Sequence, residues 1–124
     1  MEHAILDTSF ILTAVRNRID LIEELQFMGL KIVIPKQVIE EIKKVAKSEK
    51  RLHFREDAEL ALKLLSVYPY QEVDIGKGHV DDLIFEYAKK NKHVFIGTLD
   101  VGLAKRLTNR KIIIRNKKQL EVIS

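Results

Sequence analysis

Several acidic side chains of this sequence stand directly after short apolar runs or at the starts of amphipathic segments. They are Asp7, Glu40, Glu41, Asp81, Asp82 and Asp100. Three or four carboxylates packed together repel one another and raise one another's pKa values, and a bound hard cation removes that conflict. Mg²⁺ takes oxygen ligands, usually one or two carboxylates together with waters and substrate phosphates. If the fold gathers these residues, their chemistry favours metal-assisted hydrolysis of a phosphodiester.

The elements that must position these acids alternate along the chain. Short apolar runs predict strands at 4–7, 31–34, 72–74, 93–97, 112–114 and 120–123. Residues at helical spacing predict helices at 10–15, 20–28, 35–46, 58–65, 79–88 and 100–107. Strands that alternate with helices and are apolar throughout are typical of a parallel sheet covered on both faces. The predicted fold is therefore α/β, a three-layer α/β/α sandwich with a mostly parallel central sheet, in one domain over residues 1–124.

A parallel α/β sheet predicts where the acids lie. Ligand sites in such sheets lie beyond the carboxyl ends of the strands, and each helix that follows a strand starts at that same edge. Asp7 directly follows the first predicted strand, and Asp100 comes three residues after the strand at 93–97. The two acidic pairs stand in the first turns of their helices. We therefore expect acids from four distant segments to converge at one edge.

Each of these positions also has a simpler interpretation. Asp7, followed by Thr8 and Ser9, is a common kind of helix cap. Two acids in the first turns of a helix are favourable partners of the helix dipole. Taken singly, these interpretations are preferred, and only the joint placement of the acids favours a metal site.

Four blocks of the sequence resemble, in order, the signature blocks of PIN-domain ribonucleases. They are Ile5-Leu6-Asp7-Thr8-Ser9, then Ile34-Pro35 with Val38 and Glu40-Glu41-Ile42, then Asp81-Asp82-Leu83-Ile84, and Gly97-Thr98-Leu99-Asp100 with Leu103. Each block alone is a weak signal, but the match spans essentially the whole chain. The resemblance implies an endoribonuclease that uses Mg²⁺ or Mn²⁺.

The resemblance also assigns roles to individual residues. Asp7 and Asp100 would be direct metal ligands, Asp81 a third, and Glu41 a ligand that acts partly through water. The neighbouring Glu40 and Asp82 are close enough in sequence to be the second choices. The hydroxyls of Ser9 and Thr98 would orient carboxylates or water. One departure is Gly102, where many relatives carry a further acid, which leaves open whether a second metal binds.

The distribution of charge indicates a polyanionic partner. The chain carries a net charge of +4, but residues 103–124 hold seven Lys or Arg against one acid, and residues 36–55 hold seven against three. A basic rim around an acidic cluster would hold the phosphates of RNA while the cluster cuts. Of these residues, Lys44, Lys105 and Arg106 are the expected contacts to RNA. Basic runs are equally often solvated helix faces.

The sequence favours some partners and compartments over others. Stand-alone PIN toxins are of this size, and a toxin would have an antitoxin as its partner. Proteins related to the PIN endonucleases of ribosomal RNA processing are also of this size, and such a protein would have a ribosome-assembly factor as its partner. The basic C-terminal block at 111–120 slightly favours the second group. A homodimer is expected, as is a cytoplasmic protein with no membrane segment. The absence of Cys excludes thiol chemistry.

Two other functions remain as alternatives. Gly102 and the modest net charge fit a catalytically inactive RNA-binding or assembly module on the same fold. A phosphoacceptor domain that uses Asp7 is disfavoured, because no second Asp stands two residues after it.

Overall fold

The computed structural model of the chain describes residues 2–124, which form six strands and six helices. The strands are β1 (His3–Leu6), β2 (Lys31–Pro35), β3 (Gln71–Val73), β4 (Phe95–Gly97), β5 (Lys111–Arg115) and β6 (Gln119–Ile123). The helices are α1 (Thr8–Arg16), α2 (Leu21–Phe27), α3 (Lys36–Ala46), α4 (Leu52–Val67), α5 (Val80–Lys90) and α6 (Val101–Arg106). Within the described residues, no helix combines the length and the apolar content needed to cross a bilayer.

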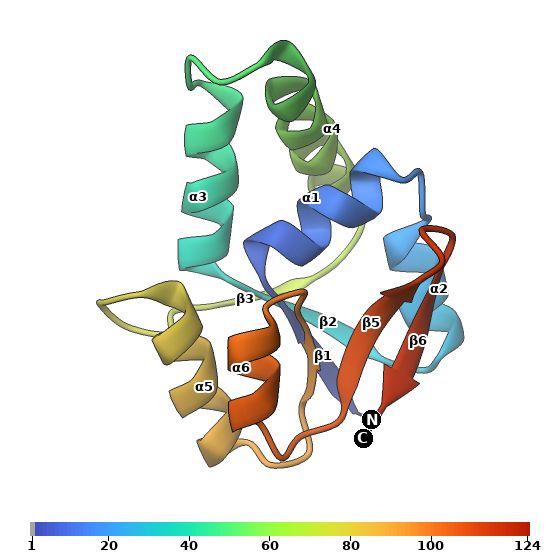
Figure 1. Cartoon of the computed structure of the whole chain (residues 1–124), viewed down its shortest axis with the longest axis vertical. Helices are drawn as coiled ribbons and strands as arrows, with labels where there is room; N and C mark the ends of the chain where they lie inside the picture. The colour runs from blue at the N-terminus through green and yellow to red at the C-terminus, as the bar shows by residue number, and fades with distance from the viewer. Residues whose placement is uncertain (1) are drawn as a thin grey trace.

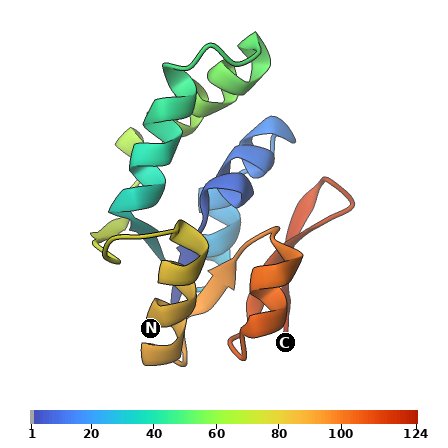
Figure 2. The same ribbon diagram turned by 60° about the vertical axis from the view of Figure 1, so that its left-hand side comes forward.

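The six strands form one sheet in the order β3-β2-β1-β4-β5-β6. All neighbouring pairs are parallel except β5 with β6, which form an antiparallel hairpin at the edge. Helices α1 to α4 pack on one face, and α5 and α6 pack on the other (Figures 1 and 2). The predicted three-layer arrangement with a mostly parallel sheet is confirmed.

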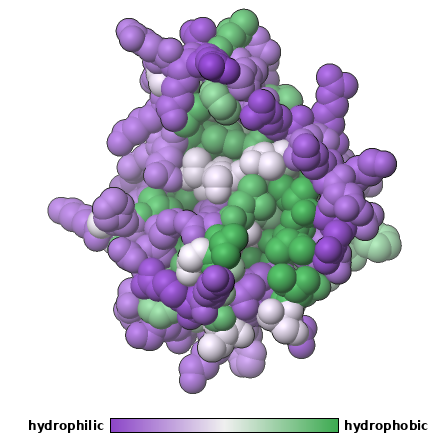
Figure 3. All heavy atoms as spheres, viewed as in Figure 1, coloured by the Kyte–Doolittle hydropathy of each residue, from purple (hydrophilic) through white to green (hydrophobic). Residues whose placement is uncertain are grey.

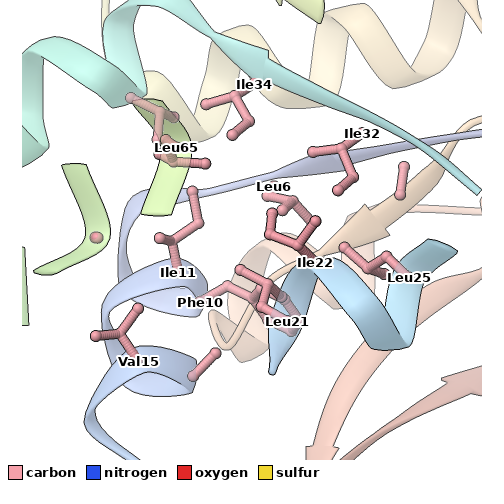
Figure 4. Packing of buried hydrophobic residues seen from close by; sticks show 14 of the residues in the cluster. Leu6, Phe10, Ile11, Val15, Leu21, Ile22, Leu25, Ile32, Ile34 and Leu65 are labelled. Atoms are coloured by element: carbon pink, nitrogen blue, oxygen red, sulfur yellow. The ribbon is translucent and has the colours of Figure 1, made fainter. Parts of the chain in front are cut away.

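Side chains of the central strands alternate between two cores. Leu6 and Ile34 belong to the larger core under α1 to α4, whereas Ile5 and Val33 belong to the smaller core under α5 and α6. Successive strand residues point to opposite faces, and both faces are covered, so these strands read as continuous apolar runs. In Figure 3, hydrophilic residues form the rim of the face shown, and a hydrophobic patch lies near its middle. Figure 4 shows the larger core, where side chains of α1 and α2 meet those of β1 and β2.

Most predicted element boundaries lie within two residues of the observed ones, and two of the differences concern segments that carry charge. Strand β4 begins at Phe95 rather than at residue 93, because Lys92 and His93 form a turn after α5. The charged stretch 47–57 is a loop only as far as Arg51, and α4 begins at Leu52. Neither change moves an acidic residue away from the carboxyl edge of the sheet.

The path of the chain creates a crevice beside β1. From β1 the chain runs outward through β2 to β3, and then crosses over to place β4 on the other side of β1. Ligands in open α/β sheets bind at such a switch point. Gly97 at the end of β4 permits the close packing here, because a Cβ at this position would lie 2.7 Å from Cδ2 of Leu6. The ends of β1 and β4, where Asp7 and Asp100 follow, therefore lie side by side.

Candidate active site

A cavity of about 280 Å³ lies at the carboxyl edge of the sheet, beside the ends of β1 and β4. It is lined by Asp7, Thr8, Ser9, Glu41, His79, Val80, Asp81 and Asp100. One acid comes from each of the four segments that the sequence placed at this edge. No lysine or arginine among residues 2–124 lines the cavity, so its carboxylates lack a cationic neighbour in its wall.

Asp7 is buried at the floor of the site and is held by three donors. As the N-cap of α1, its Oδ1 accepts hydrogen bonds from the N–H of Phe10 (2.9 Å) and from the hydroxyl of Ser9 (3.2 Å). Its Oδ2 accepts from the hydroxyl of Thr98 (2.5 Å). Burial raises the pKa of Asp7, and these hydrogen bonds limit the rise. Asp7 therefore caps a helix and still presents a carboxylate to the cavity.

Asp100 is the N-cap of α6 and is tied to Asp7 through Thr98. Its Oδ1 accepts from the N–H of Leu103 (2.9 Å), and its own N–H donates to Oγ1 of Thr98 (3.1 Å). The Leu103 hydrogen bond, with a contribution from Asp81, holds the pKa of Asp100 below its ordinary value. A Cβ at Gly102 would lie 3.1 Å from Oδ1 of Asp100, so a larger residue there would crowd this carboxylate.

Asp81, in the first turn of α5, has the most disturbed ionisation in the site. Its pKa is raised to about 6, first by partial burial and then by a hydrogen bond with Asp100. Repulsion from Asp100, Asp7 and Glu41 adds to the rise. The four carboxylates therefore interact electrostatically although they come from segments far apart in sequence.

Glu41 reaches the site from the second turn of α3. Its Oε1 accepts a hydrogen bond from the hydroxyl of Thr8, which follows Asp7. This contact joins α3 to the start of α1 and places the Glu41 side chain at the cavity wall.

The other member of each acidic pair does not line the cavity. Glu40 lies 4.0 Å from Nζ of Lys36 on the exposed side of α3. Asp82 accepts from Nη1 of Arg106 at 2.9 Å. The structure therefore brings Asp7, Glu41, Asp81 and Asp100 together, and it does not bring Glu40 and Asp82 with them.

Comparison with known proteins identifies the family to which this site belongs. A family model described as a PIN like domain matches residues 4–119. The chain belongs to the PIN-like domain family.

Several relatives of this PIN-like domain are known. Ribonuclease VapC4 of Methanocaldococcus jannaschii is 30% identical to this chain over 122 residues, which cover 94% of the chain and 92% of that protein. The solved PIN domain endonuclease Utp24 is 22% identical with a TM-score of 0.76, covering 96% of this chain and 90% of that one. VapBC2 from Rickettsia felis, solved bound to a DNA fragment from its promoter, is 18% identical with a TM-score of 0.60, covering 87% and 97%. The two solved structures show a shared fold.

The donor set of this PIN-like domain fits a divalent cation in its chemistry. All the candidate ligands are carboxylate oxygens, and the pKa of Asp81, raised first by burial, is raised further by neighbouring carboxylates whose charge a cation would offset. Among residues 2–124, no three acidic or histidine side chains are already arranged around one point as metal ligands. Asp7, Asp100 and Glu41 also accept hydrogen bonds from donors of the protein itself.

The basic residues expected to contact RNA differ in their surroundings. Arg106 is bonded to Asp82 and lies over the ring of Phe85, 4.2 Å from its centroid. Lys105 and Lys44 are exposed on α6 and α3, and neither forms an ion pair within residues 2–124. The guanidinium of Arg106 is thus the least available of the three to a phosphate.

Two residues of the cavity wall were missed from sequence. Thr8 is the donor to Glu41, and His79 precedes α5 and lines the cavity beside Asp81. The sequence does contain a signal for His79. It stands two residues before Asp81, where the helix begins, and this end of the helix lies at the carboxyl edge of the sheet. No signal in the sequence distinguished Thr8 from Ser9, because the Thr8 contact joins residues 33 positions apart.

Proposed function

We propose that this PIN-like domain is an endoribonuclease that hydrolyses RNA phosphodiester bonds with the help of Mg²⁺ or Mn²⁺. The observation that carries the proposal is the cavity at the switch point of the sheet. Four carboxylates line it, and no lysine or arginine among residues 2–124 does. The relatives named as a ribonuclease and as an endonuclease support the reaction class.

Asp7, Asp81, Asp100 and Glu41 are the residues that would hold the metal. When bound, the ion would lower the pKa of an attacking water and offset the charge that develops on the phosphodiester. By analogy with the family, the products would carry a 3′-hydroxyl and a 5′-phosphate.

The surrounding residues of the chain fix the directions of these carboxylates. Thr98 bonds Asp7 and the backbone of Asp100 at the same time, so it sets the spacing between the two acids. Ser9 holds the other oxygen of Asp7, and Thr8 holds Glu41. Hydroxyls that orient ligands in this way are worth about 10- to 100-fold in metal affinity or activity.

Two biological roles fit this activity, and each names a partner. A toxin would bind an antitoxin, as the VapBC2 complex of Rickettsia felis suggests by analogy. A ribosomal RNA processing enzyme would bind a ribosome-assembly factor, and the basic β5–β6 hairpin favours this role. A homodimer and a cytoplasmic location remain predictions. Copurification of the protein with its native partners separates the two roles, because only the toxin should bring down a small antitoxin.

Cleavage of RNA by purified protein tests the activity. We expect cutting of single-stranded or structured RNA that stops on addition of a chelator and returns with Mn²⁺. The Asp7→Asn variant from the same preparation should cut at a background rate. If it cuts as fast as the parent, the activity belongs to a contaminant and the proposal fails.

The same cleavage assay tests the second candidate function, a catalytically inactive RNA-binding module. Gly102, which stands in the place of a further acid in many relatives, favours this second candidate. A module of that kind would bind RNA, show no chelator-sensitive cleavage, and give no Mn²⁺ binding that depends on Asp7 and Asp100.

A further inference from the structure

Basic side chains of three segments gather at the end of the α3–α4 hairpin that is farthest from the sheet. Figures 1 and 2 show α3 and α4 as an antiparallel pair that rises beyond the rest of the molecule, with the last turn of α1 beside α4. We call this region the basic tip. Its members are Arg16, Lys43, Lys44, Lys47, Lys50, Arg51 and Arg55. The surface over α3 and α4 in Figure 3 is correspondingly hydrophilic.

The cations of the basic tip form no ion pair within residues 2–124. The ion pairs among residues 2–124 are Lys36 with Glu40, Glu86 with Lys89, Asp82 with Arg106, and Arg115 with Glu121. None of them includes a member of the basic tip. Six of the seven members are exposed, and the seventh, Arg55, is half-buried. This unneutralised charge attracts a polyanion from solution.

Arg55 adds an independent observation. Its Nε is buried and has no hydrogen-bond partner within the described residues. An unsatisfied buried donor costs free energy, more so on a charged group. An anion that reaches the other nitrogens of this half-buried guanidinium would offset its charge, and phosphate suits the planar fork of Arg.

The basic tip is connected to the acidic cavity by α3 itself. Glu41 lines the cavity, and Lys44 and Lys47 follow it at three-residue intervals on neighbouring sides of the helix. At 1.5 Å of rise per residue, Lys44 and Lys47 lie about 4.5 Å and about 9 Å beyond Glu41 along the helix axis. Four carboxylates at the cavity repel phosphates, so the free energy that brings a nucleic acid there must come from neighbouring cations. Helix α3 supplies them at a spacing that a few nucleotides span.

Flat side chains at the basic tip favour an unpaired strand over a duplex. Phe54 is 39% exposed, and its ring lies close to the guanidinium of Arg16 (5.4 Å from the centroid) and to the ring of His53 (4.1 Å between centroids). Unstacked RNA bases are bound by stacking on aromatic rings and guanidinium planes, while the backbone follows a basic groove.

We propose that the basic tip binds the single-stranded RNA that flanks the bond to be cut, and that it sets the affinity for RNA without taking part in the chemistry. This inference rests on the proposed ribonuclease function. It assigns the binding of substrate to the α3–α4 hairpin and the end of α1, rather than to the C-terminal basic residues.

A binding experiment without metal tests the inference separately from the cleavage activity. The probe is a fluorescent single-stranded RNA, and its anisotropy is measured in chelator at several salt concentrations. The test variant combines Lys43→Gln, Lys47→Gln, Lys50→Gln and Arg51→Gln. The matched control removes the same charge elsewhere by Lys89→Gln, Lys90→Gln, Lys92→Gln and Lys118→Gln. Thermal unfolding of both variants checks that the fold is kept.

We expect the test variant to bind the RNA about 10- to 100-fold more weakly at low salt. The slope of log affinity against log salt concentration should also become shallower, by about 0.7 for each lost phosphate contact. The control should stay within about 3-fold of the parent. In cleavage assays the test variant should raise KM and keep kcat. Equal losses in the two variants would overturn the inference, because the effect would then follow total charge. So would a loss of kcat at unchanged KM.

Two further outcomes are informative. If the parent binds RNA through the basic tip but never cuts it, the proposed ribonuclease function fails while this surface stands. If the test variant keeps its RNA affinity and instead loses a protein that copurifies with the parent, the basic tip is a protein interface and the inference is wrong. Arg55→Lys keeps the charge but loses the planar fork, and we expect it to weaken RNA binding less than the fourfold variant.

Discussion

The inner and outer faces of helices α3 and α5 carry the same kind of side chain in opposite surroundings. On the inner faces, Glu41 and Asp81 line a cavity shared with other carboxylates. On the outer faces, Glu40 and Asp82 lie beside Lys36 and Arg106. Consecutive residues on a helix are rotated by about 100°, which is enough to separate two neighbouring acids in this way.

The difference shows which acids cost stability and which do not. The outer acids have cationic partners at the surface, where an ion pair is worth about 0 to 1 kcal/mol. On the inner face, Asp81 is partly buried and faces other carboxylates, and these causes, burial first, raise its pKa to about 6. Both disfavour the charged form of the group, and a bound cation would offset them. The inner face is therefore where function is expected, and the outer face serves as a built-in control.

The largest expected contrast is in the cleavage of RNA by the two Asp variants of α5. Asp81→Asn should lower the single-turnover rate on the order of 1000-fold, because metal-ion stabilisation of the transition state is worth several kcal/mol. Asp82→Asn should stay within about 2-fold of the parent, since it removes only a surface ion pair. Similar losses in both variants would show that the two faces are not functionally distinct.

Substitutions of Glu41 and Glu40 on α3 should also differ in their effect on the cleavage rate, with the larger loss again on the inner face, but by a smaller factor than the two Asp variants. Glu41→Gln is expected to reduce cleavage by about 10- to 100-fold, the range for residues that act through an intermediate group. Glu40→Gln serves as the matched control, with a rate close to that of the parent. A loss confined to Glu40→Gln would mean that α3 presents its other face to substrate.

The buried hydroxyl between the two N-cap acids is expected to matter for stability. Thr98→Val removes the donor to Asp7 and the acceptor for the N–H of Asp100. Leaving buried polar groups unsatisfied should lower the free energy of unfolding by about 1 to 3 kcal/mol, as measured in urea. The exposed Thr108→Val should change it by no more than about 0.5 kcal/mol. If the two variants are equally stable, the Thr98 bridge does not hold the inner face together.

The smallest expected effect is a pH dependence of stability in chelator. The pKa of Asp81 is raised in the folded protein above its value of about 3.9 in an unfolded chain. The folded state thus binds more protons between about pH 4 and about pH 6, and stability is lost as the pH rises through this window. Asp81→Asn should reduce that decline, of which the raised pKa of Asp7 keeps a part, and should be more stable than the parent at neutral pH. The Asp82→Asn curve should run parallel to that of the parent, and an Asp81→Asn curve that does so would contradict the raised pKa of Asp81.

Much of the fold and of the site's location could be predicted from the sequence. Apolar runs buried on both faces identify the strands of a parallel sheet, and Asp7 and Asp100 directly follow two of them. Their positions at the carboxyl edge follow from chain direction alone. The placement of Glu41 and Asp81 at the cavity agrees with the choice that the family resemblance favoured, although their catalytic role stays a prediction.

What could not be predicted depends on contacts between distant segments. The Thr8–Glu41 bond and the Arg106–Asp82 pair join residues 33 and 24 positions apart, and no local pattern specifies them. The sequence likewise does not show which cations of the two basic segments are paired with acids. Residues 103–124 and 36–55 have similar numbers of cations, but Arg106 and Arg115 are paired with acids in the first, whereas in the second the cations beyond Lys36 form no ion pair within residues 2–124.

Titration calorimetry with Mn²⁺ tests most directly whether the inner carboxylates form a metal centre. The parent and Asp82→Asn should bind Mn²⁺ with the same heat and stoichiometry, because the outer face takes no part. Asp81→Asn should bind far more weakly, and Asp7→Asn with Asp100→Asn should show no binding heat. Unchanged Mn²⁺ binding in Asp81→Asn and in Asp7→Asn with Asp100→Asn, or its loss in Asp82→Asn, would contradict the assignment of the metal to the cavity.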